Sequence, residues 1–334
     1  VYHGSSIMLD KKYYLEALKN VKDSVLYLLT FYGNDPRDSL IGVENMLDNI
    51  GEIITNPGIN LLYDKFKNRP AVIVSTGPSL NKNKHLLKGL EDKALIICPD
   101  ASLKILLELG VKPHLVTALE RVKITAELVK GFSREETEDI YYAACPVVQN
   151  LAYQYYPGPR IIVYRNFDHF KWLDIDRGIL DIKGSSGNMA FKIAAAAGCS
   201  PILLIGQALA YADNGITHAQ GSVLGENQET NKVKRFKVKG NCSEQVETNS
   251  TWDLFRKGYE IDLKEYRGTC INSTEGGAYI EGTELMPFRD AIDKYIGEAF
   301  NPLEVIKKEL DKFPSDNICR DIEKLDIKIE KTIN

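Results

Sequence analysis

The chain has 334 residues, of which 44% are hydrophobic and 26% charged, a composition typical of a folded globular protein with a sizeable core. Its net charge of −4 argues against a nucleic-acid partner, because proteins that bind phosphate backbones carry a positive footprint. No apolar run reaches the roughly 18 residues of a membrane-spanning helix, so we expect no membrane partner. The chain also lacks the basic-then-apolar start of a signal peptide, which favours a cytoplasmic protein.

The six cysteines are widely separated and form no CxxC pair, so neither a zinc site nor a disulfide framework is indicated. They are Cys98, Cys145, Cys199, Cys242, Cys270 and Cys319. We expect reduced thiols, most of them buried. The chain begins with Val1 rather than Met, which favours a piece excised from a longer protein.

Residues 1–68 predict a helical lead-in to the main domain. Apolar residues recur at three-to-four spacing over residues 13–33, the pattern of an amphipathic helix. A second helix is predicted over residues 39–54, and the segment TNPGI ends it.

Residues 69–286 predict the main domain, in which short β-rich runs alternate with helical segments. This alternation is typical of βαβ units and a parallel sheet. The predicted strands are residues 71–75, 94–98, 114–119, 140–145, 160–164, 201–206 and 269–272. Helices are predicted over 101–111 and 187–198, with Gly110 and Gly198 at their ends. The nearly continuous apolar strands indicate coverage on both faces, so we predict a doubly wound, mostly parallel, Rossmann-like α/β sheet.

The chain becomes hydrophilic after Gly221. Residues 232–249 alternate like a hairpin with its turn at Gly240 and Asn241, and residues 251–266 predict a helix opened by Thr251. Residues 287–334 predict a helical C-terminal segment that is amphipathic and rich in lysine. We interpret its charged face as a solvated surface rather than a partner surface.

Two small-residue segments stand where a phosphate would bind. Ligands of open α/β sheets bind beyond the carboxyl ends of the strands, and TGPSL (76–80) follows the first strand. The segment GSSGN (184–188) precedes a helix, whose positive end attracts anions. The alternative for both segments is a plain turn or helix cap. Neither matches GxGxxG or a Walker A loop, so the sequence disfavours NAD-dependent enzymes and P-loop NTPases.

Titratable residues stand at the same predicted edge. Asp100 and Glu120 follow neighbouring strands and could hold ribose hydroxyls, although a lone carboxylate is more often solvated. Arg121 could neutralise a phosphate or a sugar carboxylate, or pair structurally. His218 lies in a polar loop after an apolar strand, where an imidazole can transfer a proton; the alternative is a surface histidine.

Four segments, taken in this order, resemble the motility accessory factor (Maf) family of flagellin glycosyltransferases. They are residues 71–80, 99–121, 184–221 and 271–283, and the resemblance spans residues 42–282. It implies a cytoplasmic enzyme that moves a pseudaminic, legionaminic or sialic acid from its CMP-activated form to Ser or Thr hydroxyls of flagellin, without a metal or other cofactor. The central domain of that family is also similar to bacterial sialyltransferases and to archaeal 6-hydroxymethylpterin pyrophosphokinase-like domains. The second similarity leaves an ATP- and Mg²⁺-dependent transferase as an alternative.

For such a transfer we assign roles to individual residues. The nucleotide and phosphate would contact Thr76, Gly77, Pro78, Ser79, Asp100, Ser185, Ser186, Gly187, Asn188, Gly206 and Gln207. The donor sugar would contact Glu120, Arg121, Tyr211 and Thr274. Asp213, His218 and Glu275 compete for the role of general base.

Ala208 departs from the family, in which the segment Gly-Gln-Asp-Leu-Ala is usual at this place. An alanine removes charge, hydrogen-bond acceptors and any proton transfer. Either this copy is inactivated, or another residue has taken over the role, or the change was introduced to stall turnover, which we favour. A non-catalytic flagellin-binding module is the further alternative. The particular sugar, the acceptor residues, the stereochemistry and the oligomeric state do not follow from the sequence.

Overall fold

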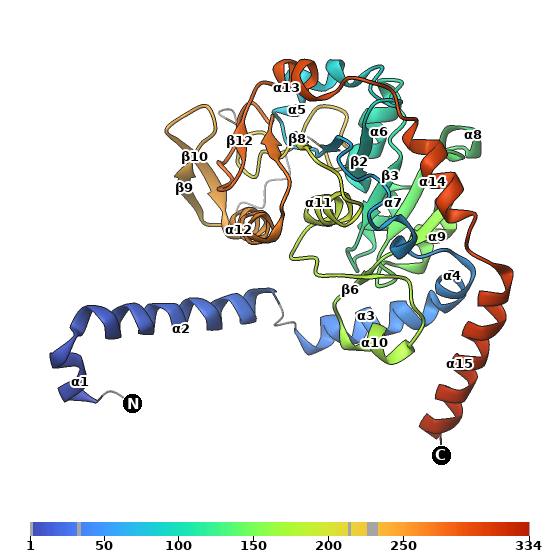
Figure 1. Ribbon diagram of the computed structural model, residues 1–334, viewed down its shortest axis with the longest axis horizontal. Helices are drawn as coiled ribbons and strands as arrows, with labels where there is room; N and C mark the ends of the chain where they lie inside the picture. The colour runs from blue at the N-terminus through green and yellow to red at the C-terminus, as the bar shows by residue number, and fades with distance from the viewer. Residues whose placement is uncertain (1–2, 32–34, 213–214, 226–232, 334) are drawn as a thin grey trace. The chain divides into compact units, whose positions relative to one another are not determined.

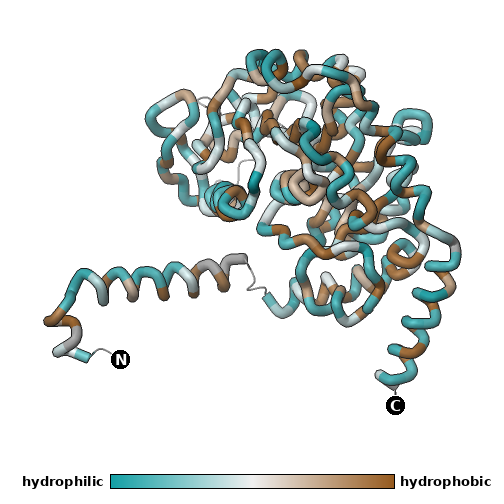
Figure 2. The backbone as a smooth tube through the Cα atoms, in the orientation of Figure 1, coloured by the Kyte–Doolittle hydropathy of each residue, from teal (hydrophilic) through white to brown (hydrophobic). Residues whose placement is uncertain are grey.

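The computed structural model describes residues 3–31, 35–212, 215–225 and 233–333, and the chain forms two compact units, Val1–Leu40 and Ile41–Asn334. In the first unit α1 (Gly4–Leu9) precedes α2 (Lys11–Phe31). The Asp10 carboxylate accepts a hydrogen bond from the Tyr13 N–H at 3.0 Å and so supports the first turn of α2. Helix α2 confirms the helix predicted from the apolar spacing as far as residue 31, and residues 32 and 33 lie outside the described residues. Both hydrophilic and hydrophobic positions occur along it in Figure 2.

The second unit is built on an eight-stranded parallel sheet (Figure 1). In spatial order its strands are β12 (Glu284–Leu285), β11 (Cys270–Asn272), β8 (Ile202–Ile205), β1 (Ala71–Val74), β2 (Leu95–Pro99), β3 (Leu115–Ala118), β4 (Tyr141–Ala144) and β5 (Arg160–Ile162). The chain runs from β1 outward to β5 and then returns to β8 on the other side of β1. All seven predicted strands are present, and the doubly wound fold is confirmed, with its switch point between β1 and β8.

The central strands are buried along their whole length, as continuous apolar runs require. β1, β2, β3 and β8 have no exposed residue. Helix α11 (Ser186–Ala196) packs on these four strands, and α6 (Asp100–Glu108) packs on β2 and β3. Ala190 and Ala194 of α11 are fully buried, because their small side chains let the helix approach the sheet closely.

The remaining elements surround this sheet. The early helices are α3 (Pro36–Asp48), α4 (Ile50–Thr55), η1 (Ile59–Leu62), α5 (Leu80–Asn83), η2 (Lys84–Leu87), α7 (Ile124–Leu128), α8 (Arg134–Thr137), α9 (Asn150–Tyr155) and α10 (Asp168–Leu173). The later helices are α12 (Ser250–Glu265), α13 (Phe288–Tyr295), α14 (Pro302–Leu310) and α15 (Ser315–Ile333). Two short sheets join β6 (Tyr164–Arg165) to β7 (Ile179–Leu180) and β9 (Arg235–Lys239) to β10 (Gln245–Asn249).

The antiparallel pair β9–β10 confirms the predicted hairpin, but the predicted start of the next helix is wrong. Helix α12 begins at Ser250, and the side chain of Asn249 caps it by accepting the Trp252 N–H at 3.0 Å. Thr251 lies inside the first turn. An asparagine at the end of a strand can cap the helix that follows it directly.

The two predicted boundaries, after residues 68 and 286, do not separate compact units. Ile53, Ile59 and Phe66 are buried in the same hydrophobic core as the sheet, and so are Phe288 and Ile306 from the C-terminal helices. These segments therefore belong to the unit that begins at Ile41. Their apolar faces pack on the sheet domain because a short helix cannot bury such a face alone.

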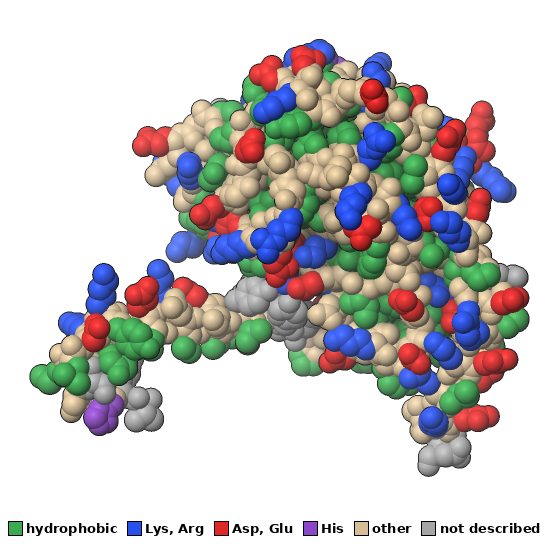
Figure 3. Space-filling view, in the orientation of Figure 1, with side chains coloured by type: hydrophobic (Ala, Val, Ile, Leu, Met, Phe, Trp, Pro, Cys, Tyr) green, Lys and Arg blue, Asp and Glu red, His purple; other side chains and the backbone are tan. Residues whose placement is uncertain are grey.

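The cysteines and the charged surface residues can be compared with what the composition predicted. All six cysteines are free, and four are buried as predicted, whereas Cys242 and Cys319 are exposed. Basic and acidic side chains are interspersed on the face shown in Figure 3. Within the described residues, no helix is both long enough and apolar enough to cross a membrane.

Candidate functional site

A cavity of about 340 Å³ lies at the switch point of the sheet, beyond the carboxyl ends of β1 and β8. Loops after β1, β2, β3 and β8 line it together with residues of α7, α11 and α12. Ligands of doubly wound sheets bind at this place, and the volume suits a small molecule. The predicted site residues that line the cavity are Thr76, Gly77, Asp100, Glu120, Ser185, Ser186, Gly187, Gly206, Gln207, Ala208 and His218.

The loops after β1 and β8 touch through their backbones. The Gly77 N–H donates to the Gly206 carbonyl at 2.7 Å, and a Cβ on Gly77 would lie 2.4 Å from that oxygen. Gly206 has φ +64°, and a Cβ there would lie 2.1 Å from the Ser75 carbonyl oxygen. Both positions therefore require glycine, and the contact holds the two loops together at the floor of the cavity.

Gln207 is fixed by hydroxyl groups from two other segments. Its Oε1 accepts hydrogen bonds from Ser75 Oγ at 2.5 Å and from Tyr259 OH at 2.9 Å. The side chain of Gln207 is buried, and Tyr259 is fully buried. A Cβ on Gly187 would lie 2.9 Å from Gln207 Oε1 and 3.0 Å from Tyr259 OH, so this position of α11 leaves room for the cluster.

The N-terminus of α11 faces the cavity, but two predicted ligand residues serve the helix itself. Ser185 Oγ accepts the Asn188 N–H at 3.2 Å, and Asn188 Oδ1 accepts the Ser185 N–H at 3.1 Å. This is a capping box. Asn188 is fully buried, donates to the Phe255 carbonyl at 3.1 Å and does not line the cavity. Ser186 and Gly187 also line the cavity and take no part in the capping box.

Asp100 and Glu120 are the acidic residues among those that line the cavity. Asp100 begins α6, and its Oδ1 accepts the Ala101 N–H at 2.9 Å. Burial raises the pKa of the Asp100 carboxyl to about 7; the Ala101 hydrogen bond opposes this shift, and the charge of Glu120 adds to it. The lining residues include no Lys or Arg among those that the structure describes. A phosphate here would rely on N–H groups, hydroxyls and the dipole of α11.

His218 is the histidine that lines the cavity, and its Nδ1 lies 2.9 Å from Thr217 Oγ1 in a hydrogen bond. Burial lowers its pKa, so the imidazole is neutral near pH 7 and can accept a proton. By contrast, His114 Nδ1 accepts the Ile96 N–H at 2.9 Å inside the sheet. Burial lowers the pKa of His114 to about 4, which makes it a structural residue.

Several predicted site residues do not line the cavity. Glu275 lies outside the lining, and its Oε1 accepts the Phe288 N–H at 2.9 Å and thereby supports the start of α13; its role as a general base stays a prediction. Arg121 also lies outside the lining, and its guanidinium lies over the Phe167 ring, 5.4 Å from its centroid; its contact with a donor sugar stays a prediction. Tyr211 packs on Trp252, with 4.6 Å between ring centroids, and its hydroxyl accepts from Asn249 at 3.0 Å.

The other predicted residues outside the lining have no such alternative contact. Ser79 and Thr274 are buried, and their hydroxyl oxygens have no hydrogen-bond partner among the described residues. Pro78 lies between Gly77 and Ser79 but outside the lining. Roles for these three in binding stay predictions. Asp213 lies outside the described residues.

The sequence and the fold were compared with known proteins. A family model described as "6-hydroxymethylpterin diphosphokinase MptE-like" matches residues 44–214, just over half of the chain. The chain belongs to this family. No curated protein matches the sequence.

A solved structure shares the fold of this MptE-like protein. It is a MAf glycosyltransferase from Magnetospirillum magneticum AMB-1, with a TM-score of 0.56 and 16% sequence identity. The match covers 81% of this chain and 42% of that one, so the MptE-like protein spans less than half of its length. At this identity the likeness shows the fold alone, and it agrees with the resemblance seen in the sequence.

Ala208 occupies a tightly packed position in the MptE-like protein. It is buried and lines the cavity, and its carbonyl accepts the Ala278 N–H at 2.8 Å. A Cβ on Gly277 would lie 2.2 Å from the Ala208 carbonyl oxygen. The Ala208 backbone is therefore closely packed against Gly277 at the edge of the cavity.

The sequence did not indicate the aromatic wall of the cavity. Trp252 and Phe255 come from α12, and Ile124, Thr125 and Leu128 come from α7. Trp252 and Phe255 are three residues apart on one helix, a spacing that places them on the same helix face. Nothing in the sequence indicated that this helix would pack beside the switch point.

Proposed function

We propose that this MptE-like protein transfers a pseudaminic, legionaminic or sialic acid from its CMP-activated form to a Ser or Thr hydroxyl of flagellin. The observation that carries the proposal is a switch-point cavity bounded by the N-terminus of α11 and lined without Lys or Arg in its described part. The phosphodiester of a CMP-sugar carries a single negative charge, which N–H groups and a helix dipole can offset. A triphosphate carries several charges and would call for cations.

Separate groups of residues would bind the phosphate, the sugar and the ribose of the donor. Thr76, Gly77, Ser186 and Gly187 would hold the phosphate through N–H and O–H groups. Glu120 would lie beside the donor sugar, and Trp252 and Phe255 would form the apolar wall. Asp100 would bind a ribose hydroxyl.

His218 would act as the general base. Its Nδ1–H would donate to Thr217 Oγ1, which leaves Nε2 to take the proton of the acceptor hydroxyl. The acceptor oxygen would attack the anomeric carbon as the bond from that carbon to the phosphate oxygen breaks. CMP would leave with the electron pair of that bond, so no oxidant or additional reactant is needed.

A second function, transfer of a diphosphate from ATP, is favoured by the family description and by the pair Asp100 and Glu120. Mg²⁺ is commonly held by one or two carboxylates together with substrate phosphates, and these two line the same cavity. Within the described residues, no cluster of three His, Cys, Asp or Glu could hold a metal by itself. A metal here would therefore depend on the phosphates of its substrate.

Thermal unfolding with CMP, and separately with ATP and Mg²⁺, distinguishes the two functions. A ligand that binds only the folded state at about 100 times its Kd adds about 2.7 kcal/mol of stability. We expect CMP to stabilise the protein; stabilisation by ATP and Mg²⁺ alone would favour diphosphate transfer.

Incubation with flagellin and a CMP-nonulosonate then tests the reaction by mass spectrometry, using the protein and its Ala208→Asp variant. Transfer by the protein itself supports the proposal, whereas transfer by the variant alone would show that Ala208 has inactivated it. No transfer by either protein would favour a flagellin-binding module.

A further inference from the structure

Two hydroxyl groups hold the carboxamide of Gln207 in one orientation, and one of them, from Tyr259, lies outside the cavity. Oε1 accepts from Ser75 Oγ at 2.5 Å and from Tyr259 OH at 2.9 Å. Tyr259 is fully buried on α12 and does not line the cavity, whereas Gln207 does. Both lone pairs of the amide oxygen are therefore occupied.

An amide whose oxygen is occupied presents its nitrogen. The –NH₂ group has two hydrogens to donate and no capacity to accept. The cluster lies against Gly187 in the first turn of α11, since a Cβ there would be 2.9 Å from Gln207 Oε1. The Gln207 carboxamide therefore lies beside the helix end at which an anion is favoured.

We propose that Tyr259 is a positioning residue that fixes the Gln207 carboxamide as a donor to a phosphate oxygen of the bound nucleotide. The inference rests on the proposed function in taking a nucleotide phosphate as the ligand. Without the Tyr259 hydroxyl the carboxamide can rotate and direct its oxygen at the phosphate. The hydroxyl thus acts on binding through Gln207, with no contact to the ligand.

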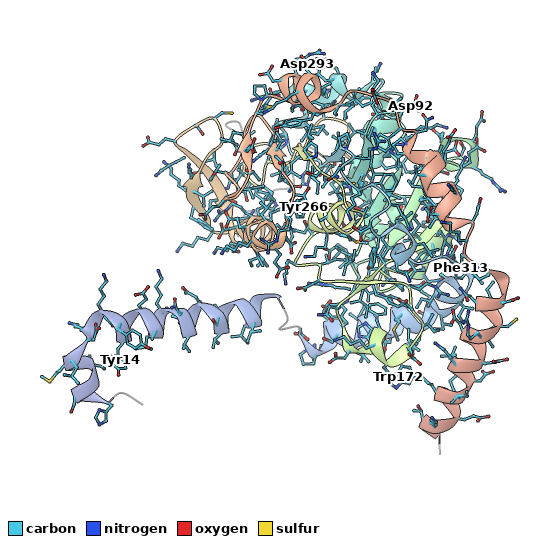
Figure 4. The ribbon with its side chains drawn as sticks, viewed as in Figure 1. Tyr14, Asp92, Trp172, Tyr266, Asp293 and Phe313 are labelled. Atoms are coloured by element: carbon cyan, nitrogen blue, oxygen red, sulfur yellow. The ribbon has the colours of Figure 1, made fainter. Side chains whose placement is uncertain are left out.

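Tyr266 provides a matched control. Tyr259 and Tyr266 both lie edge-on to Phe191, with ring centroids 5.6 and 5.5 Å away. The Tyr266 hydroxyl donates to the Cys199 carbonyl at 2.6 Å, however, and does not contact Gln207. Tyr266, labelled in Figure 4, directly follows α12, so Tyr266→Phe removes a comparable hydroxyl elsewhere on the same aromatic cluster.

The experiment measures Kd by calorimetry for CMP and for cytidine, which lacks the phosphate. We expect Tyr259→Phe to weaken CMP binding by about 10-fold, the effect of about one hydrogen bond, and to change cytidine binding by less than about 2-fold. Gln207→Glu keeps an acceptor for both hydroxyls but turns a carboxylate oxygen toward the phosphate. We expect it to weaken CMP binding by about 100-fold or more, because a hydrogen bond from the amide to the charged phosphate is replaced by repulsion between the carboxylate and the phosphate. Tyr266→Phe should bind both ligands like the wild type.

Three results would overturn the inference: wild-type CMP affinity in Tyr259→Phe, an equal loss for cytidine, or wild-type CMP affinity in Gln207→Glu. If Tyr259→Phe is not folded at the working temperature by circular dichroism, the comparison is made at a lower temperature at which it is folded, with Gln207→Glu as the second test of the same donor. If the wild type binds ATP with Mg²⁺ but not CMP, the proposed function fails, and the same variants are compared with ATP and adenosine. If it binds neither nucleotide, both ideas are wrong.

Discussion

Replacement of Asp100 by asparagine should change how stability depends on pH. Burial raises the pKa of this carboxyl from its ordinary value of 3.8 to about 7, against the Ala101 hydrogen bond and with the help of Glu120. The folded protein therefore keeps the Asp100 proton over a range in which the unfolded chain has released it. Stability must fall as the pH rises through this range, because the folded state binds more protons.

The size of the effect follows from the two pKa values. Below the pKa of the unfolded chain Asp100 is protonated in both states, and above about pH 7 it is ionised in both. The free energy of unfolding therefore falls between these two limits and is constant above them. At about 1.36 kcal/mol per pKa unit, the total loss is at most about 4 kcal/mol. An asparagine side chain at this position would be neutral at every pH. Relative to the wild type, Asp100→Asn should thus become more stable between about pH 4 and 7, by up to about 4 kcal/mol.

Urea unfolding of both proteins across this range measures the difference, in which the titration of all other groups largely cancels. Asp293→Asn serves as the control, since Asp293 is an exposed acid on α13 (Figure 4). The free energy of unfolding of this variant should differ from that of the wild type by the same amount at every pH in this range. A difference between wild type and Asp100→Asn that does not vary with pH would refute the reasoning.

Three further substitutions test the site and its support. Gly187→Ala would place a Cβ 2.9 Å from Gln207 Oε1 and 3.0 Å from Tyr259 OH, so this cluster must shift; CMP affinity should fall about 10-fold, and an unchanged Kd in titration calorimetry would contradict this. Ser185→Ala removes the cap of α11 and should cost about 1 kcal/mol in urea unfolding; a neutral result would show that the capping box contributes nothing. Asp321→Ala leaves the buried Arg177 without its carboxylate partner at 2.7 Å and should cost about 3 to 5 kcal/mol, with CMP affinity of the folded protein unchanged; a Tm equal to that of the wild type would count against it.

The strands and the fold class were predictable because their signals are local. Continuous apolar runs separated by helical segments indicate a covered parallel sheet wherever they occur. The position of the cavity followed from the same reading, since ligands bind beyond the carboxyl ends of such strands. Gly77, Ser186 and Gly187 were therefore assigned to the site from the sequence, and all three line it.

Other polar residues looked equally suitable in the sequence but have structural tasks. Glu275 supports the start of α13 and Asn188 completes the capping box of α11. Tyr259 shows no ligand signal in its helix, yet its hydroxyl reaches Gln207, 52 positions away in the chain. Hydrogen-bond partners this far apart in the sequence meet only when the helices pack.

By itself, the sequence determined a doubly wound sheet, the glycine- and serine-rich turns at its edge and its family, because each depends on residues that lie close together along the chain. Only the tertiary structure decided which polar groups at the sheet edge face the cavity. The physical reason is that a buried polar group must find a partner, and whether that partner comes from the protein or from a ligand depends on which segments pack around it.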